Sequence, residues 1–158
     1  MIQTLYIMRH GHASNHQGMH DFDRELSEIG KKEVSKVAKW LFQNHPKPEL
    51  VLVSPLKRAQ QTFNQLQTEF QEKLVKYDAV ALVYTSPLSS LMTEVSVYDE
   101  SPILLIGHQP LLGEFTSKLL ENKIETDFHT ASLVCLRLEK IEKTTKSKIE
   151  WQINPSML

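Results

Sequence analysis

The chain has 158 residues, of which 41% are hydrophobic and 23% charged, as is typical of one globular domain with a buried core. The formal net charge of -1 offers no electrostatic argument for binding nucleic acid or an anionic membrane. The single cysteine, Cys135, lies in an apolar run, which excludes a disulfide framework and predicts a buried structural thiol.

No apolar run approaches the length of a membrane span. Residues 1–3 lead directly into the first predicted strand, so we expect no signal peptide. Together these features predict a single cytoplasmic domain over residues 1–158, monomeric and without a membrane or nucleic-acid partner.

The first predicted strand, Leu5–Met8, ends in Arg9, His10 and Gly11. Ligands of open α/β sheets bind at the carboxyl ends of strands. The Arg9 guanidinium can bind two oxygens of a phosphate or carboxylate, and His10 can attack through a neutral nitrogen or carry a charge near neutral pH. Gly11 lets the backbone turn sharply and approach a ligand. Taken alone, three such residues more often mark an ordinary strand end with solvated side chains.

Residues 12–21 are polar and lack periodicity, which predicts a loop. The next helix is expected to open within Leu26–Gly30, with Ser27 as its N-cap, and to end before Pro46 and Pro48. Its predicted core face consists of Ile29, Val34, Val37, Ala38 and Leu41.

The second buried strand is Leu50–Val53, and a helix follows it closely. The apolar spacing of that helix is given by Ala59, Phe63, Leu66 and Phe70. Arg58 lies near the helix N-terminus, where the macrodipole is positive and a cation is unfavourable. A bound anion would account for it, although an exposed arginine on a helix is a common alternative.

Three further elements are predicted before the third buried strand, which is Ile103–Ile106. Leu74–Tyr77 predicts a short strand, residues 82–87 a loop, and the apolar spacing over residues 88–98 an amphipathic helix. His108 follows the third strand, just before a helix over residues 110–120 that begins with Pro110. A lone histidine at such a place is more often structural, but this is the third strand end with a potentially cationic group.

Residues 132–138 and 149–153 are two apolar runs separated by a charged, Thr-rich segment, which predicts a β-hairpin at a sheet edge. Strands and helices alternate before this hairpin. The sequence therefore predicts an α/β three-layer sandwich with a mostly parallel central sheet flanked by helices.

In such a sheet the carboxyl ends of the three buried strands meet at one edge, which would bring together Arg9, His10, Arg58 and His108. Two guanidinium and two imidazole groups would bind a dianion, and without a Walker motif or an evident metal cage a phosphoryl group is the natural ligand. We expect His10, unprotonated on one nitrogen, to attack phosphorus in line with the leaving group. The arginines and a charged His108 would hold the other oxygens, and water would then hydrolyse the phosphohistidine.

The same residues resemble the signature motifs of the histidine phosphatase superfamily, also called the phosphoglycerate mutase-like family. These motifs are Arg9-His10-Gly11, then Leu26, Ser27 and Gly30, then Ser54, Pro55, Arg58, Ala59 and Thr62, and finally Gly107-His108. The small size and the segments 51–55, 108–113 and 151–155 are similar to the phosphohistidine phosphatases of that superfamily.

The resemblance implies a phosphatase with His10 as the phosphorylated residue and with Arg9, Arg58 and His108 completing the phosphate pocket. It implies no cofactor and no metal. Its partner would be a phosphorylated histidine-phosphotransfer or phosphotransferase protein. A small-molecule phosphomonoesterase of the same superfamily is the alternative, and a non-catalytic phosphate-binding module has no support because all pocket residues are present.

Two departures from the family pattern bear on the substrate. His12 occupies a position where many relatives carry an acidic residue. Larger relatives use a carboxylate to protonate the leaving oxygen, but the segment 84–87 offers none, which leaves Asp21 and Glu94 as candidates. Because a phosphorylated imidazole leaves through a labile P–N bond, the missing acid favours phosphohistidine over sugar phosphates.

Two further predictions concern the loop over residues 12–24. We assign Arg24 a secondary role in substrate binding, with a surface ion pair to Asp21 or Glu25 as an equal alternative. His12, His16 and His20 are spaced as ligands on one helical face would be, but Gly18 and the polar composition argue against a helix and hence against a metal site there.

Overall fold

The computed structural model describes residues 1–15, 18–121 and 127–158. Its strands are β1 (Ile2–Arg9), β2 (Leu50–Val53), β3 (Lys76–Asp78), β4 (Ile103–Gly107), β5 (Leu133–Ile141) and β6 (Thr144–Ile153). Its helices are α1 (Glu28–Asn44), α2 (Lys57–Thr68), α3 (Leu88–Ser96) and α4 (Leu111–Leu119), with short 3-10 turns η1 (Asp21–Asp23), η2 (Val80–Leu82) and η3 (Pro155–Met157).

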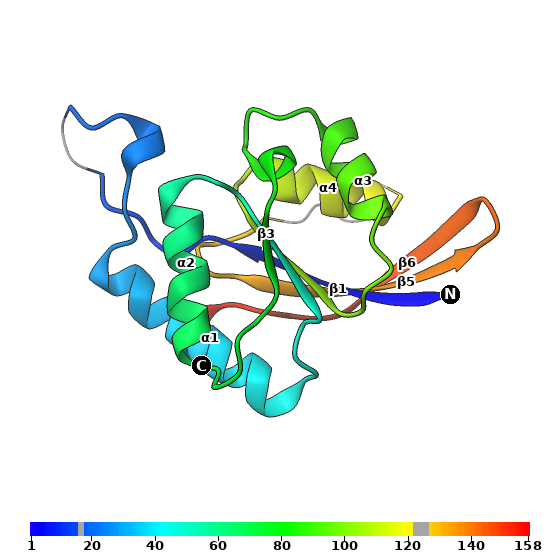
Figure 1. Ribbon diagram of the computed structural model, residues 1–158, viewed down its shortest axis with the longest axis horizontal. Coiled ribbons are helices and arrows are strands. Elements are labelled where there is room, and N and C mark those ends of the chain that lie inside the picture. The colour runs from blue at the N-terminus through cyan, green and yellow to red at the C-terminus, as the bar shows by residue number, and fades with distance from the viewer. Residues whose placement is uncertain (16–17, 122–126) are drawn as a thin grey trace.

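The six strands form one sheet in the order β3-β2-β4-β1-β5-β6. The first four of these are parallel to one another, whereas β5 pairs antiparallel with β1 and with β6. The predicted mostly parallel sheet and the edge hairpin are therefore confirmed. In Figure 1 the turn of this hairpin, in orange, extends beyond the rest of the sheet.

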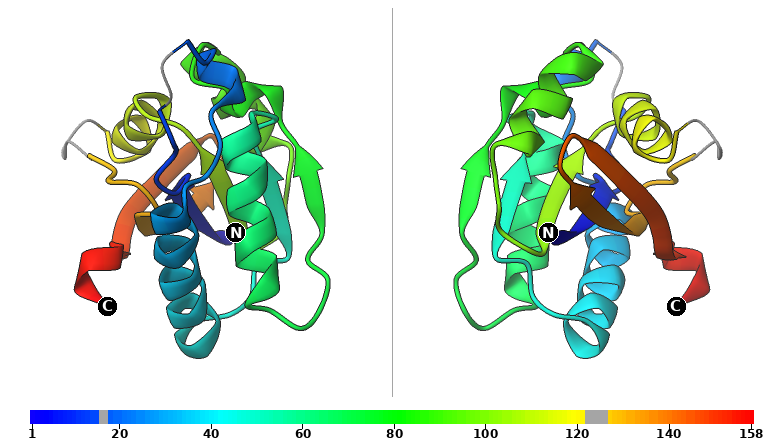
Figure 2. Two further views of the ribbon diagram at one scale, coloured as in Figure 1. Left: turned by 90° about the vertical axis from the view of Figure 1, so that its left-hand side faces the viewer. Right: turned by 90° about the vertical axis from the view of Figure 1, so that its right-hand side faces the viewer.

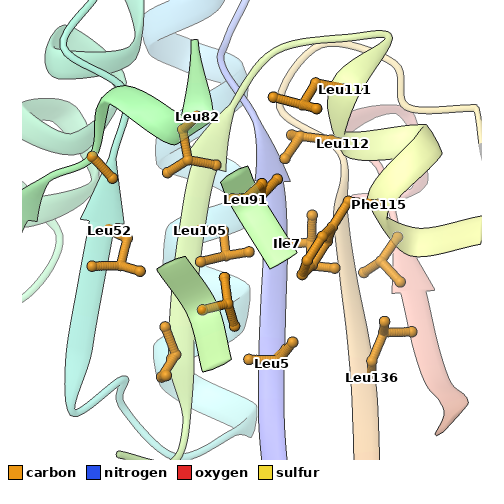
Figure 3. Close-up of a cluster of buried hydrophobic side chains, with 14 of the residues drawn as sticks. Leu5, Ile7, Leu52, Leu82, Leu91, Leu105, Leu111, Leu112, Phe115 and Leu136 are labelled. Carbon is orange, nitrogen blue, oxygen red and sulfur yellow. The ribbon is translucent and has the colours of Figure 1, made fainter. Parts of the chain in front are cut away.

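Helices cover both faces of the sheet, which gives the predicted three layers (Figures 1 and 2). Alternate residues of the central strand β1 point to opposite faces: Tyr6 and Met8 pack in one apolar cluster with α1 and α2, and Leu5 and Ile7 in another with α3 and α4. Figure 3 shows the second cluster, where Phe115 of α4 lies over β1. Burial on both faces explains why β2, β4 and the Leu5–Met8 part of β1 are apolar in sequence.

Helix α1 begins as predicted, because the Ser27 side chain accepts a hydrogen bond from the Gly30 amide. One member of its predicted core face is wrong: the Ile29 side chain is 63% exposed. Ile29 precedes Val34 by five residues, which places it about 140° around the helix from that buried position. The short strand β3 also starts later than predicted, at Lys76, and Phe70 lies beyond the end of α2.

Two glycines allow the segment after β1 to pack directly on α1. A Cβ at Gly30 would lie 2.2 Å from the His12 carbonyl oxygen, and one at Gly11 would lie 2.7 Å from a Leu26 methyl. The sequence suggested that Gly11 serves a sharp turn and a close approach to a ligand. In the structure it serves a close approach to α1, which fixes the position of the neighbouring His10.

Cys135 of β5 is buried, and burial raises the pKa of its thiol to about 12, as expected for a structural cysteine. Within the described ranges, none of the helices combines the length and apolar character that a membrane span requires.

Candidate active site

The carboxyl ends of β1 and β4 and the N-terminus of α2 meet at one edge of the sheet and form a pocket of about 460 Å³. All four predicted catalytic residues line it, as does Arg24. The described lining consists of Arg9, His10, His12, Ala13, Asp21, Arg24, Arg58, Tyr84, His108, Gln109 and Thr130. Three of these residues are arginines and only one is acidic, so the pocket suits an anion.

His10 is buried, and its Nε2 lone pair faces Arg58. Its Nδ1 lies 2.7 Å from the Gly11 carbonyl oxygen, which can only accept, so Nδ1 carries the proton. The Arg58 Nε donates to Nε2 over 3.3 Å. Burial, with a smaller contribution from the Arg58 charge, lowers the pKa of His10 to about 3. The imidazole is therefore neutral near pH 7 and nucleophilic at Nε2.

Arg58 is buried at the N-terminus of α2, which has no side-chain cap. Its Nη1 donates to the Asp21 carbonyl oxygen over 2.8 Å, and its Nη2 lies 3.2 Å from the Asp21 carboxylate. Thr62 joins this helix to the end of β1, because its hydroxyl donates to the Arg58 carbonyl and accepts from the Gly11 amide. This explains why the second arginine motif includes a threonine one turn after the arginine.

Two polar nitrogens in the pocket walls are buried without a hydrogen-bond partner among the described residues: Arg9 Nε and His108 Nδ1. The neighbouring nitrogens have partners at two positions: Arg9 Nη1 donates to the Phe128 carbonyl, and His108 Nε2 lies 2.7 Å from the Ser54 hydroxyl. Leaving such groups unpaired is costly. An anion whose oxygens reach both nitrogens would satisfy them.

The rings of His10 and His108 lie 5.1 Å apart. Burial, with the neighbouring His10 and Arg58, lowers the pKa of His108 to about 2. The structure therefore differs from the charged clamp expected at this position: the His108 imidazole is neutral, because it has left water and faces cations. A neutral imidazole can still donate one hydrogen bond to a phosphate oxygen.

Asp21, on η1, lies in the pocket wall. Its carboxylate accepts hydrogen bonds from the Tyr84 hydroxyl over 2.7 Å, from Arg58 and from Arg24. The hydrogen bond from Tyr84, together with the charge of Arg58, lowers the pKa of Asp21. Asp21 is therefore an ionised carboxylate. The other candidate acid, Glu94 of α3, accepts a hydrogen bond from the Tyr98 hydroxyl and is not among the described residues of the pocket.

Arg24 forms the ion pair with Asp21 that was one of the two alternatives, with Nη1 3.3 Å from Oδ1. It also lines the pocket, and its role in substrate binding stays a prediction. It also donates to the carbonyls of Ala13 and Ser14, so it holds the loop that carries it. Glu25, the other predicted partner, pairs with Lys57.

Sequence reasoning missed four residues of the pocket wall: Ala13, Tyr84, Gln109 and Thr130. Tyr84 occupies the segment where a carboxylate was sought, and its hydroxyl supplies the contact to Asp21 from there. Gln109 follows His108 directly, and Thr130 is placed by hydrogen bonds to Glu33 of α1. None has a local pattern that distinguishes it from an ordinary loop residue.

His12 lies exposed at the pocket mouth, where its Nδ1 is 2.7 Å from the Ser27 hydroxyl. His16, the middle residue of the alternative metal site, lies outside the described residues. Within them, no three His, Cys, Asp or Glu side chains gather in a way that could hold a metal ion.

Comparison with known proteins points to one family. A family model described as "Histidine phosphatase superfamily (branch 1)" matches residues 5–81. Phosphohistidine phosphatase SixA of Escherichia coli strain K12 is 29% identical over 162 residues, which cover 98% of this chain and 95% of that protein. The chain is thus similar to the histidine phosphatase superfamily and, within it, to SixA. These similarities support a phosphatase enzyme.

One further relative is similar in sequence, and two solved structures share the fold. A SixA homolog of Haemophilus influenzae is 27% identical, with 84% of this chain and 87% of that protein covered. A structure of SixA complexed with tungstate has the same fold, with a TM-score of 0.84 at 24% identity over 98% of this chain and 99% of that one. A mycobacterial glucosyl-3-phosphoglycerate phosphatase also shares the fold, with a TM-score of 0.73 at 18% identity, covering 95% and 98% of the two chains.

Proposed function

We propose that this phosphatase removes the phosphoryl group from a phosphorylated histidine on another protein, through a covalent phosphohistidine on His10. The observation that carries the proposal is the state of His10 itself. Its Nδ1 proton is held by the Gly11 carbonyl, and its Nε2 lone pair opens onto a pocket with unpaired hydrogen-bonding nitrogens. A neutral imidazole so placed is a nucleophile for phosphorus.

The proposed reaction has two steps. The phosphoryl oxygens bind to Arg9, Arg58 and His108, and the His10 Nε2 lone pair forms a bond to phosphorus as the bond to the leaving nitrogen breaks. The ring of His10 then carries a phosphoryl group on Nε2 and a proton on Nδ1, which the Gly11 carbonyl stabilises. In the second step water attacks phosphorus, releases inorganic phosphate and restores the neutral imidazole.

The choice of phosphohistidine rests on three observations. Two relatives that cover most of this chain are named as a phosphohistidine phosphatase and its homolog. Among the described lining residues the only acidic one is Asp21, whose carboxylate is ionised and thus a poor proton donor. A P–N bond to imidazole needs less proton donation than the alkoxide of a sugar phosphate does. The partner we propose is a phosphorylated histidine-phosphotransfer or phosphotransferase protein.

The experiment compares turnover of a phosphohistidine-bearing carrier protein with turnover of a panel of phosphomonoesters. His10→Ala removes the proposed nucleophile, and His129→Ala is the matched control because His129 is exposed and outside the pocket. Fast loss of phosphohistidine that His10→Ala abolishes and His129→Ala preserves supports the proposal. Preferential turnover of the phosphomonoesters would instead favour the alternative, a small-molecule phosphatase.

A further inference from the structure

We propose that Asp21 determines the substrate class of this pocket, by accepting a hydrogen bond from the N–H group of a nitrogen leaving group. The inference rests on the proposed function and deepens it: phosphoramidates of imidazole would be selected over phosphate esters. In this role Asp21 acts as a carboxylate acceptor and not as a general acid.

The placement of Asp21 is built from three separate segments. Tyr84, after η2, donates to Oδ2, and Arg58 of α2 donates to the same oxygen, while Arg24, after η1, donates to Oδ1. Figure 2 places the blue segment with η1 and the green segment after η2 at the same end of the molecule. Three donors fix the carboxylate without a hydrogen bond from the helix backbone, so the side chain has a defined orientation in the wall.

The hydrogen bonds of the described residues leave one acceptor position of this carboxylate unused. A carboxylate offers about four lone-pair sites, and Tyr84, Arg58 and Arg24 use three of them. The Asp21 side chain is 43% exposed, and the residue lines the pocket beside His108. A further donor can therefore approach it from the side on which the substrate enters.

The groups that face Asp21 keep it ionised. They are the Tyr84 hydroxyl and the guanidinium groups of Arg58 and Arg24. A carboxylate in this setting has no proton to give to a leaving oxygen. It is well suited to accept a hydrogen bond from an N–H group of the substrate.

Phosphohistidine brings such a proton, because the nitrogen that does not carry phosphorus can be protonated near neutral pH. When the P–N bond breaks, its electron pair stays on the departing nitrogen, and the phosphoryl group passes to His10 Nε2. The proton remains on the other ring nitrogen, and the imidazole leaves as a neutral molecule. The two rings then play mirrored roles: Gly11 holds the proton of the acceptor ring and Asp21 that of the donor ring.

Tyr84 is a positioning residue in this arrangement. Its ring lies edge-on to the rings of Phe22 and His108, with centroids 6.1 Å and 5.7 Å away, and beneath the Arg58 guanidinium at 5.9 Å. These contacts orient the hydroxyl toward Asp21. Replacing Tyr84 by phenylalanine keeps the ring and removes only the hydrogen bond.

The test uses two small substrates, phosphoimidazole and p-nitrophenyl phosphate, so that docking of a carrier protein plays no part. Asp21→Ala should lower kcat/KM for phosphoimidazole about 10- to 100-fold, the value of one hydrogen bond to a charged group. It should lower kcat/KM for p-nitrophenyl phosphate less, because that substrate loses only the support that the Asp21 carboxylate gives to Arg58, so the ratio of the two kcat/KM values should fall. Asp21→Asn, which keeps a neutral acceptor, should give an intermediate ratio.

Tyr84→Phe should lower the phosphoimidazole rate less than Asp21→Ala, and should have no effect in the Asp21→Ala background. An equal loss on both substrates in Asp21→Ala and Asp21→Asn leaves the ratio of the two kcat/KM values unchanged. That result would mean that Asp21 only holds the loop, and it would overturn the inference. If the unmodified protein turns over p-nitrophenyl phosphate but neither phosphoimidazole nor a phosphohistidine carrier, the proposed function itself fails, whatever the variants do.

Discussion

The neutral state of two buried histidines predicts that this protein loses stability between pH 7.5 and pH 5.5. Burial lowers the pKa of His10 from 6.5 to about 3 and that of His108 from 6.5 to about 2. In the unfolded chain both rings titrate near 6.5. The unfolded state therefore binds more protons than the folded state over this range, and the free energy of unfolding falls as the pH falls through 6.5.

The size of the loss follows from the same values. At pH 5.5, about one unit below the unfolded pKa, each histidine lowers the free energy of unfolding by about 1.4 kcal/mol relative to pH 7.5. The pair together contribute about 3 kcal/mol, a large share of the stability of a typical domain. Asp and Glu residues titrate near pH 4 in unfolded chains and add little above pH 5.

Urea unfolding followed by the fluorescence of Trp40 and Trp151 measures the effect at pH 7.5, 6.5 and 5.5. His10→Gln and His108→Gln should each remove about half of the loss, and the double variant nearly all of it. His45, whose pKa burial also lowers, contributes a smaller part with the same sign. Stability that changes by less than about 1 kcal/mol between pH 7.5 and 5.5 would refute the reasoning, as would a loss that persists in the double variant.

Three substitutions test the packing and hydrogen bonds of the site. In Gly30→Ala the new Cβ would lie 2.2 Å from the His12 carbonyl oxygen, so we expect urea unfolding to show a loss of about 1–3 kcal/mol and the activity to fall, whereas a gain from helix propensity would contradict the proposed contact. Arg58→Lys keeps the positive charge but loses the planar guanidinium that can bind two oxygens, and steady-state kinetics should show kcat/KM about 100-fold lower. Retention of more than about a tenth of the activity would argue against a role of Arg58 in binding the phosphoryl group. Thr62→Val leaves the buried Gly11 amide without its acceptor and should lower the free energy of unfolding by about 1–3 kcal/mol, while a neutral effect in the same urea assay would mean that this hydrogen bond is dispensable.

The sequence by itself determined the parallel strands, their helices and the residues at their carboxyl ends. Local apolar runs identify buried strands, and β2 begins and ends where the run Leu50–Val53 does. A side chain that follows such a run must lie at the sheet edge, so Arg9, His10 and His108 could be assigned to one pocket without a structure. Their geometry in the pocket agrees with that prediction.

The tertiary structure decided what depends on contacts between distant segments. The strand order, the contact of Gly30 with His12 and the meeting of Asp21 with Tyr84 each join residues whose local sequence carries no sign of the other. The charge of His108 also depends on contacts between distant segments. A histidine at a strand end can be charged or neutral, and burial beside Arg58 and His10 makes this one neutral. Local pattern determines which residues are buried and where strands end, whereas desolvation and long-range hydrogen bonds set their protonation and their chemistry.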